Sequence, residues 1–198
     1  AIFALGTWPW MGQIVHTLKW PRQAWAWVLV LWQGAEVSGQ MGSWLIGFNP
    51  QFAQMKRLTW PVAVHLLWQF PLELPIENLL LLGLIAAAWR FLRPHSRYEA
   101  LSAAFLGALA FASWHMFTWN SWVVVPLTLG VLPWTIYLVM TGDMIVPIIA
   151  HILFDMEGTL SIVLPAHIMA TGSIFLLVMA ALSLGVIWHQ GRMPRQWV

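Results

Sequence analysis

Long runs of apolar residues follow one another along the whole chain, with only short polar connections between them. A helix needs about 20 consecutive, mostly apolar residues to cross the hydrocarbon of a bilayer. The runs are continuous rather than alternating, which favours helices over the strands of a membrane barrel. The 198 residues are enough for about six to eight crossings.

Composition agrees with this pattern, because only 8% of the residues are charged and 60% are hydrophobic, whereas soluble domains carry about 25% charged residues. We therefore predict an integral membrane protein whose main partner is the lipid bilayer. The expected fold is an all-α polytopic bundle of about seven or eight transmembrane helices, with residues 1–198 forming a single membrane domain. The absence of cysteine excludes disulfides, thiolate nucleophiles and cysteine-ligated metals. A net charge of +2 indicates no nucleic-acid partner.

Turn residues and charges divide the chain into expected spans, with Pro71 and Pro75 separating the third span from the fourth. The expected spans are 2–17, 23–48, 58–71, 75–92, 98–119, 122–140, 143–162 and 164–189.

Basic residues cluster at the ends of these spans, and cytoplasmic loops carry an excess of Lys and Arg. Three groups fall on one side of an eight-span bundle, whereas Lys19 and Arg22 fall on the other. The three groups are Lys56 with Arg57; Arg90 with Arg93 and Arg97; and Arg192 with Arg195. This predicts a bacterial cytoplasmic (inner) membrane protein with a cytoplasmic C-terminus.

The chain has 16 tryptophans, and many of them lie near expected span ends. Tryptophan favours the membrane–water interface, because its ring is apolar and its N–H needs a polar partner. Interfacial anchoring explains most of them, and contact with lipids or pigments is the alternative. The tryptophans near span ends are Trp8, Trp10, Trp20, Trp44, Trp60, Trp89, Trp119, Trp122 and Trp188.

Four ionisable side chains lie inside the apolar runs: Glu77, His115, His151 and Asp155. A charged group at the centre of a membrane helix costs at least ~2.5 kcal/mol, so such groups usually face the bundle interior and mark function. In the expected topology they converge in a cavity in the outer half of the bilayer.

The spacing within each segment gives local detail and leaves structural alternatives open. His151 and Asp155 are four residues apart, so they share a helix face at about 6 Å; a hydrogen bond between helix turns would also explain them. Phe111 is four residues before His115 and is expected to wall the pocket beside its imidazole, although His115 could instead reach the interface. Glu77 follows Pro75 and could be a first-turn acid.

Together these residues have the chemistry needed to hydrolyse a peptide without a covalent intermediate. A Glu beside a His can hold and deprotonate a water molecule, and a second His with a hydrogen-bonding partner can stabilise an oxyanion. No cofactor or metal is required. The same ligands could bind zinc, but the His-Glu-x-x-His spacing of zinc proteases is absent, so a metal site ranks second.

The ordered motifs resemble those of the CPBP group (CAAX proteases and bacteriocin-processing enzymes, also called Abi), which are glutamic-type intramembrane proteases. The group's pattern is Glu-Glu-x-x-x-Arg, then Phe-x-x-x-His, then His-x-x-x-Asn or Asp. Residues 111–115 fit the second motif and residues 141–155 the third, and the resemblance covers a core of about 71–160. In the first motif Asn78 occupies the position of the pattern's second Glu, and Leu82 occupies the position of its Arg.

The resemblance implies that Glu77 activates water with His115 as its partner, that His151 and Asp155 stabilise the oxyanion, and that Asn78 and Phe111 support the site. The expected function is an intramembrane endopeptidase that cleaves a membrane-associated peptide or a membrane-anchored protein segment. Because the first motif is degenerate, the alternative is an inactive CPBP-like scaffold or assembly subunit of a larger membrane complex. A small transporter ranks last, since no inverted repeat is visible.

Overall fold

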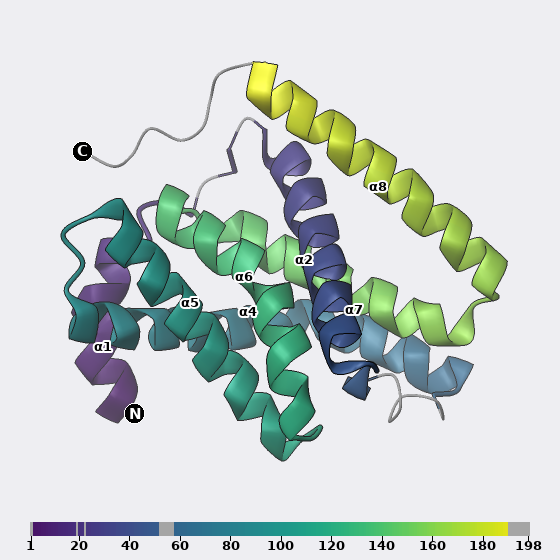
Figure 1. Ribbon diagram of the computed structural model, residues 1–198, viewed down its shortest axis with the longest axis horizontal. Helices are drawn as coiled ribbons and strands as arrows, with labels where there is room; N and C mark the ends of the chain where they lie inside the picture. Colours follow the sequence, from purple (N-terminus) through teal and green to yellow (C-terminus); the bar gives the residue numbers. More distant parts are fainter. Residues whose placement is uncertain (1, 19, 22, 52–57, 190–198) are drawn as a thin grey trace.

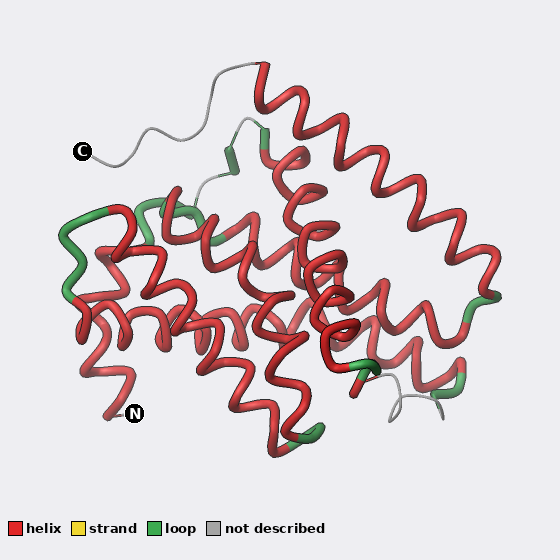
Figure 2. The backbone as a smooth tube through the Cα atoms, viewed as in Figure 1, coloured by secondary structure: helices red, strands yellow, loops and turns green. Residues whose placement is uncertain are grey.

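The computed structural model describes residues 2–18, 20–21, 23–51 and 58–189, and in these residues the chain is built of helices without a β-strand (Figure 2). The predicted all-α class is therefore confirmed. The described residues contain seven α-helices and two short 3-10 helices. These are α1 (Ile2–Ile14), α2 (Ala24–Ile46), α4 (Trp60–Leu92), α5 (Arg97–Trp114), η1 (His115–Phe117), η2 (Ser121–Val123), α6 (Val124–Thr141), α7 (Ile145–Val163) and α8 (Ala166–His189).

Five helical segments among the described residues are long and apolar enough to cross a membrane. They are Trp60–Leu92, Tyr98–Phe117, Ser121–Thr141, Ile145–Val163 and Ala166–His189. These helices are compatible with an integral membrane protein in contact with the bilayer, but they are fewer than the seven or eight transmembrane helices expected from the sequence. The 13 residues of α1 rise about 20 Å, which is less than the ~30 Å hydrocarbon core.

The expectation that prolines divide residues 58–92 into two spans is wrong. Pro71 and Pro75 both lie inside the single 33-residue helix α4. Proline removes one helical hydrogen bond and crowds the preceding turn, yet membrane helices tolerate it where neighbouring groups and waters satisfy the freed carbonyls. At a rise of 1.5 Å per residue, α4 is about 50 Å long. Glu77 is consequently near the middle of a helix, rather than in its first turn.

Small residues bring α2 and α6 into close backbone contact. Gly39 lies against Gly130, and a β-carbon added at Gly42 would stand 2.5 Å from the Cα of Pro126. Small residues at such positions let membrane helices pack through their backbones. The indole of Trp134 on α6 adds a hydrogen bond of 3.2 Å to the carbonyl of Leu31 on α2. These contacts hold α6 in place against α2.

The turn between α6 and α7 is tied to the segment after α1. Gly142 has a φ of +67°, a left-handed conformation that glycine adopts without strain. Its carbonyl accepts from the backbone N–H groups of His16 and Thr17 at 2.8 and 3.1 Å. The chain turns tightly at residues 141–143, where the Asp143 carboxylate accepts from the Ile145 N–H at 3.0 Å. Burial raises the pKa of Asp143 above its ordinary value.

Helix α8 lies along one side of the molecule and packs mainly on α2 (Figure 1). Its outer face is apolar and exposed, with Ile174, Phe175 and Leu182 each more than half exposed. Tryptophans near helix ends are also exposed, including Trp44 and Trp188. Such a surface suits lipid, because the bilayer is as apolar as the side chains that meet it.

Candidate functional site

The four predicted ionisable residues come from α4, the end of α5 and α7, and α4 packs on both of the other helices. Glu77 is half-buried in the middle of α4, His115 is half-buried where α5 passes into η1, and His151 is buried in α7 one turn before Asp155. Electrostatic interactions join Glu77 to His115, His115 to His151, and Glu77 to Asp155. The structure thus brings together side chains up to 78 residues apart in sequence (155 minus 77), and their catalytic roles stay predictions.

His115 is oriented by the last turn of α5. Its Nδ1 lies 2.9 Å from the carbonyl oxygen of Phe111, and the two rings are in contact with centroids 4.6 Å apart. A carbonyl oxygen can only accept, so Nδ1 carries a proton, and in the neutral imidazole Nε2 keeps its lone pair. Phe111 is itself 1% exposed and holds the imidazole from one side. The free lone pair of Nε2 can accept a hydrogen bond from a water beside Glu77.

His151 is oriented by a contact with the side-chain amide of Asn78. The Asn78 Nδ2 donates to the carbonyl of Leu74 at 2.8 Å and lies 2.9 Å from Nδ1 of His151. Because the Leu74 carbonyl must face an N–H group, the amide orientation is set and its second N–H points at His151. Nδ1 of His151 therefore accepts, and its proton lies on Nε2.

The proton on Nε2 of His151 faces the carboxyl group of Asp155, one turn later on the same helix. Nε2 of His151 lies 3.8 Å from Oδ2 of Asp155, which is longer than a hydrogen bond but well within electrostatic reach. The side chain of Asp155 is 30% exposed, whereas that of His151 is 7% exposed. A neutral imidazole with a donor at Nε2 is suited to stabilising negative charge on a bound oxygen.

Trp134 completes the surroundings of His151 and was not among the predicted site residues. Its ring stacks on the imidazole at 4.5 Å with an angle of 34°, and Phe154 meets its edge at 5.5 Å. Trp134 is 2% exposed and lies in the middle of α6, unlike the tryptophans near span ends. That central position was the signal in the sequence that could have identified it.

A second polar cluster lies on another side of α7, and sequence reasoning missed it. Glu157 of α7 accepts a hydrogen bond from Gln33 of α2 at 3.2 Å and one from Ser173 of α8 at 3.0 Å. Glu157 is two residues beyond Asp155, about 200° around the helix, so it faces α2 and α8 instead of α4. Glu36 interacts electrostatically with Glu157, which places it with this cluster.

Other serines and histidines of the apolar helices do not belong to these two clusters. The hydroxyls of Ser113 and Ser161 donate hydrogen bonds to backbone carbonyls of their own helices, at 2.8 and 2.7 Å. His65 and His167 are exposed. In the part of the chain that the structure describes, no three His, Asp or Glu side chains are grouped so that they could hold one metal ion.

Comparison with models of protein families, with curated proteins and with solved structures gave no match.

Proposed function

We propose that the chain is a glutamic-type intramembrane endopeptidase of the CPBP kind, which cleaves a membrane-associated peptide or protein segment with a water activated by Glu77 and His115. The observation that carries the proposal is the cluster of Glu77, His115, His151 and Asp155, four ionisable groups from three helices of an otherwise apolar bundle. Groups of this kind are costly inside a membrane, so those that occur there usually mark a function.

In the proposed reaction Glu77 takes a proton from a water molecule whose oxygen attacks the carbonyl carbon of the scissile peptide. His115 holds the same water through the lone pair on Nε2, which its bond to the Phe111 carbonyl leaves free. A positioned base of this kind contributes about 10²- to 10⁴-fold to the rate. The C–O bond forms first. The C–N bond then breaks as the proton held by Glu77 passes to the leaving nitrogen.

His151 has the hydrogen-bond donor that the tetrahedral intermediate requires. Its Nε2–H is directed by the amide of Asn78 on the opposite ring nitrogen and can donate to the negatively charged oxygen. Loss of one such donor typically costs about 10²- to 10³-fold in kcat. Asp155 lies near this donor and keeps the imidazole turned toward the reacting centre.

The first motif departs from the CPBP pattern at two positions with different surroundings. Asn78 is 3% exposed and bonds His151, so the residue at the second Glu has a place in the site. Leu82 is 3% exposed and belongs to the apolar core, so the charge of the usual Arg has no counterpart there. This second departure keeps an inactive scaffold subunit of a membrane complex as the alternative function.

We further propose six membrane crossings, formed by α2 with the five long apolar segments, in the cytoplasmic membrane of a bacterium. The 23 residues of α2 rise about 35 Å, enough to cross the hydrocarbon. Arg90 and Arg93 end α4 and mark the cytoplasmic side, and α8 then runs toward that side, leaving the C-terminus cytoplasmic. The other basic residues of the topology prediction lie outside the described residues or have side chains that are not described: Lys19, Arg22, Lys56, Arg57, Arg97, Arg192 and Arg195.

The test compares Glu77→Gln and His115→Ala with matched controls in proteoliposomes. Glu99→Gln and His65→Ala are the controls, since both residues are exposed and lie outside the cluster, at the start of α5 and on α4. A library of membrane-inserted peptides is incubated with each protein, and new peptide ends are identified by mass spectrometry. We expect cleavage by the wild type and both controls, and a loss of at least 10²-fold in the two site variants. Undiminished cleavage by Glu77→Gln would refute the mechanism, and the absence of any cleavage by the wild type would favour the scaffold.

A further inference from the structure

An apolar groove lies between α4 and the end of α5; its lining residues are near Glu77 and His115 in sequence, although neither of these two lines it. We infer that it is a specificity subsite, which binds a bulky apolar side chain of the peptide whose scissile bond is held at that pair. The inference rests on the proposed function and adds to it the class of residue that the substrate must carry.

The groove has a volume of about 350 Å³. A cavity of about 150 Å³ lined by apolar side chains binds benzene, and ligand pockets begin at about 300 Å³. The space is therefore sufficient for one large side chain, such as an aromatic ring or a branched aliphatic group, with room for part of a neighbour. Its lining comes from α4 (Leu80 and Leu84), α5 (Ala110, Ser113 and Trp114) and η1 (Met116 and Phe117).

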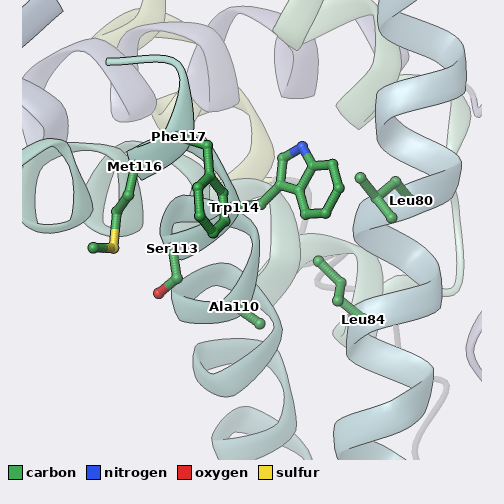
Figure 3. Close-up of a pocket in the computed structure, with 7 residues that line it drawn as sticks. All are labelled: Leu80, Leu84, Ala110, Ser113, Trp114, Met116 and Phe117. Carbon is green, nitrogen blue, oxygen red and sulfur yellow. The ribbon is translucent and has the colours of Figure 1, made fainter. Parts of the chain in front are cut away.

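The lining selects for an apolar occupant. Figure 3 shows Leu80 and Leu84 reaching from α4 toward the ring of Trp114. The rings of Trp114 and Phe117 meet edge to face at 6.3 Å and 74°, an arrangement that can extend to a third ring. The one hydroxyl in the lining, that of Ser113, is bonded to the Leu109 carbonyl at 2.8 Å and offers little to a polar group.

Chain continuity joins the groove to the candidate site. His115 stands in sequence between two lining residues, Trp114 and Met116. On α4, Leu80 is three residues after Glu77, and residues at that spacing lie about 5–6 Å apart on one helix face. An extended peptide advances about 3.3–3.6 Å per residue. A residue within two positions of the scissile bond therefore reaches the groove.

The groove is also accessible from the membrane side. Trp114 is 63% exposed and Phe117 is 89% exposed, so a segment lying in the bilayer can enter sideways between α4 and α5. At the other end the two helices close together, because Gly107 packs on Ile85 with no space for a β-carbon. That closed end lies about 12 Å along the helices from Glu77 and His115, so the groove extends from Ile85 and Gly107 toward the pair.

Ala110→Trp tests the subsite, because Ala110 is exposed in the groove and a larger side chain there fills the space without entering the core. Ala181→Trp is the control, since Ala181 is also exposed but lies on α8. The probes are membrane-spanning peptides that carry a photoreactive phenylalanine at successive positions, and the host protein is Glu77→Gln in lipid nanodiscs. We expect crosslinks to Trp114 or Met116 from one position only, reduced at least tenfold by Ala110→Trp and unchanged by Ala181→Trp.

Cleavage by the protein with an intact Glu77 gives the second readout. For a peptide cut by the wild type, replacing the crosslinking residue by Ala should raise KM about 10- to 200-fold with little change in kcat, and Ala110→Trp should reproduce that effect. The inference fails if Ala110→Trp binds and cleaves every peptide like the wild type while Glu77→Gln remains inactive. It also fails if a photoreactive phospholipid labels Met116 and saturating peptide does not displace it, because the groove is then a lipid site. The proposed function fails separately, through normal cleavage by Glu77→Gln.

Discussion

Replacing Asn78 by Ala removes the amide that sets the tautomer of His151, and the cost can be worked from the contacts. The Leu74 carbonyl that Asn78 also bonds remains in the hydrogen-bond ladder of α4, so its loss of a second donor is minor. The Nδ1 atom of His151, by contrast, is in a side chain only 7% exposed and loses its partner at 2.9 Å. A buried acceptor left without a donor costs about 1–3 kcal/mol, and we expect that fall in the free energy of unfolding.

Two measurements check this reasoning. Unfolding in detergent gives the stability change, with Gln40→Ala as the control, since Gln40 is an exposed amide whose loss should cost no more than about 0.5 kcal/mol. Nitrogen NMR of histidine-labelled protein gives the tautomer, and His151→Gln assigns the His151 signals by their absence. We expect the proton on Nε2 in the wild type and a changed spectrum in Asn78→Ala. A wild-type His151 with its proton on Nδ1 would show that the hydrogen-bond reasoning is wrong.

Three further predictions concern the packing of the bundle and its pH dependence. Gly42→Ala places a methyl group 2.5 Å from a backbone carbon of α6 and should lower the stability measured by thermal unfolding by about 1–3 kcal/mol. Gly172→Ala is the control and should cost nothing, because nothing lies within 4 Å of the added carbon. Equal losses of stability in the two variants would argue against close packing of α2 on α6. Ser173→Ala removes a hydrogen bond between α8 and α7 and should lower stability by about 1 kcal/mol. Proteolysis of the α7–α8 connection should become faster. Unchanged proteolysis would mean that this hydrogen bond does not hold α8 on α7. Because burial raises the pKa of Asp143 in the folded chain above its ordinary value, the folded state keeps that proton to higher pH. Stability should therefore fall as pH rises through the raised pKa. Asp143→Asn should remove that fall in unfolding curves from pH 4 to 8, and an unaltered slope would assign it to other groups.

Apolar runs predict helices well, because a membrane leaves the backbone little choice of structure. That argument identified the all-helical class and the segments that form α5, α6, α7 and α8. It failed at Pro71 and Pro75, because a proline inside a membrane helix is tolerated where neighbouring groups and waters satisfy the freed carbonyls. Inside a bundle, packing keeps α4 continuous through both residues.

The candidate site was predictable in part, because a charge inside an apolar run is visible in sequence. Glu77, His115, His151 and Asp155 could be named in this way. The contacts that orient them depend on tertiary structure: the Asn78 amide reaches a histidine 73 residues away, and Trp134 stacks on it from α6. The polar cluster at Glu157 was missed because its partners lie on α2 and α8, far away in sequence.

The two prolines of α4 bear on how water reaches a reaction centre surrounded by hydrocarbon. Each proline lacks the N–H that would bond the carbonyl four residues earlier, so the carbonyl oxygens of Leu67 and Pro71 lack their usual helical donor. In a bilayer such oxygens attract water molecules. The Pro71 carbonyl is about 9 Å along the helix from Glu77, a distance that three or four hydrogen-bonded waters cover. Under the proposed function, these two carbonyls are water-binding positions on α4 from which water would reach the carboxylate of Glu77.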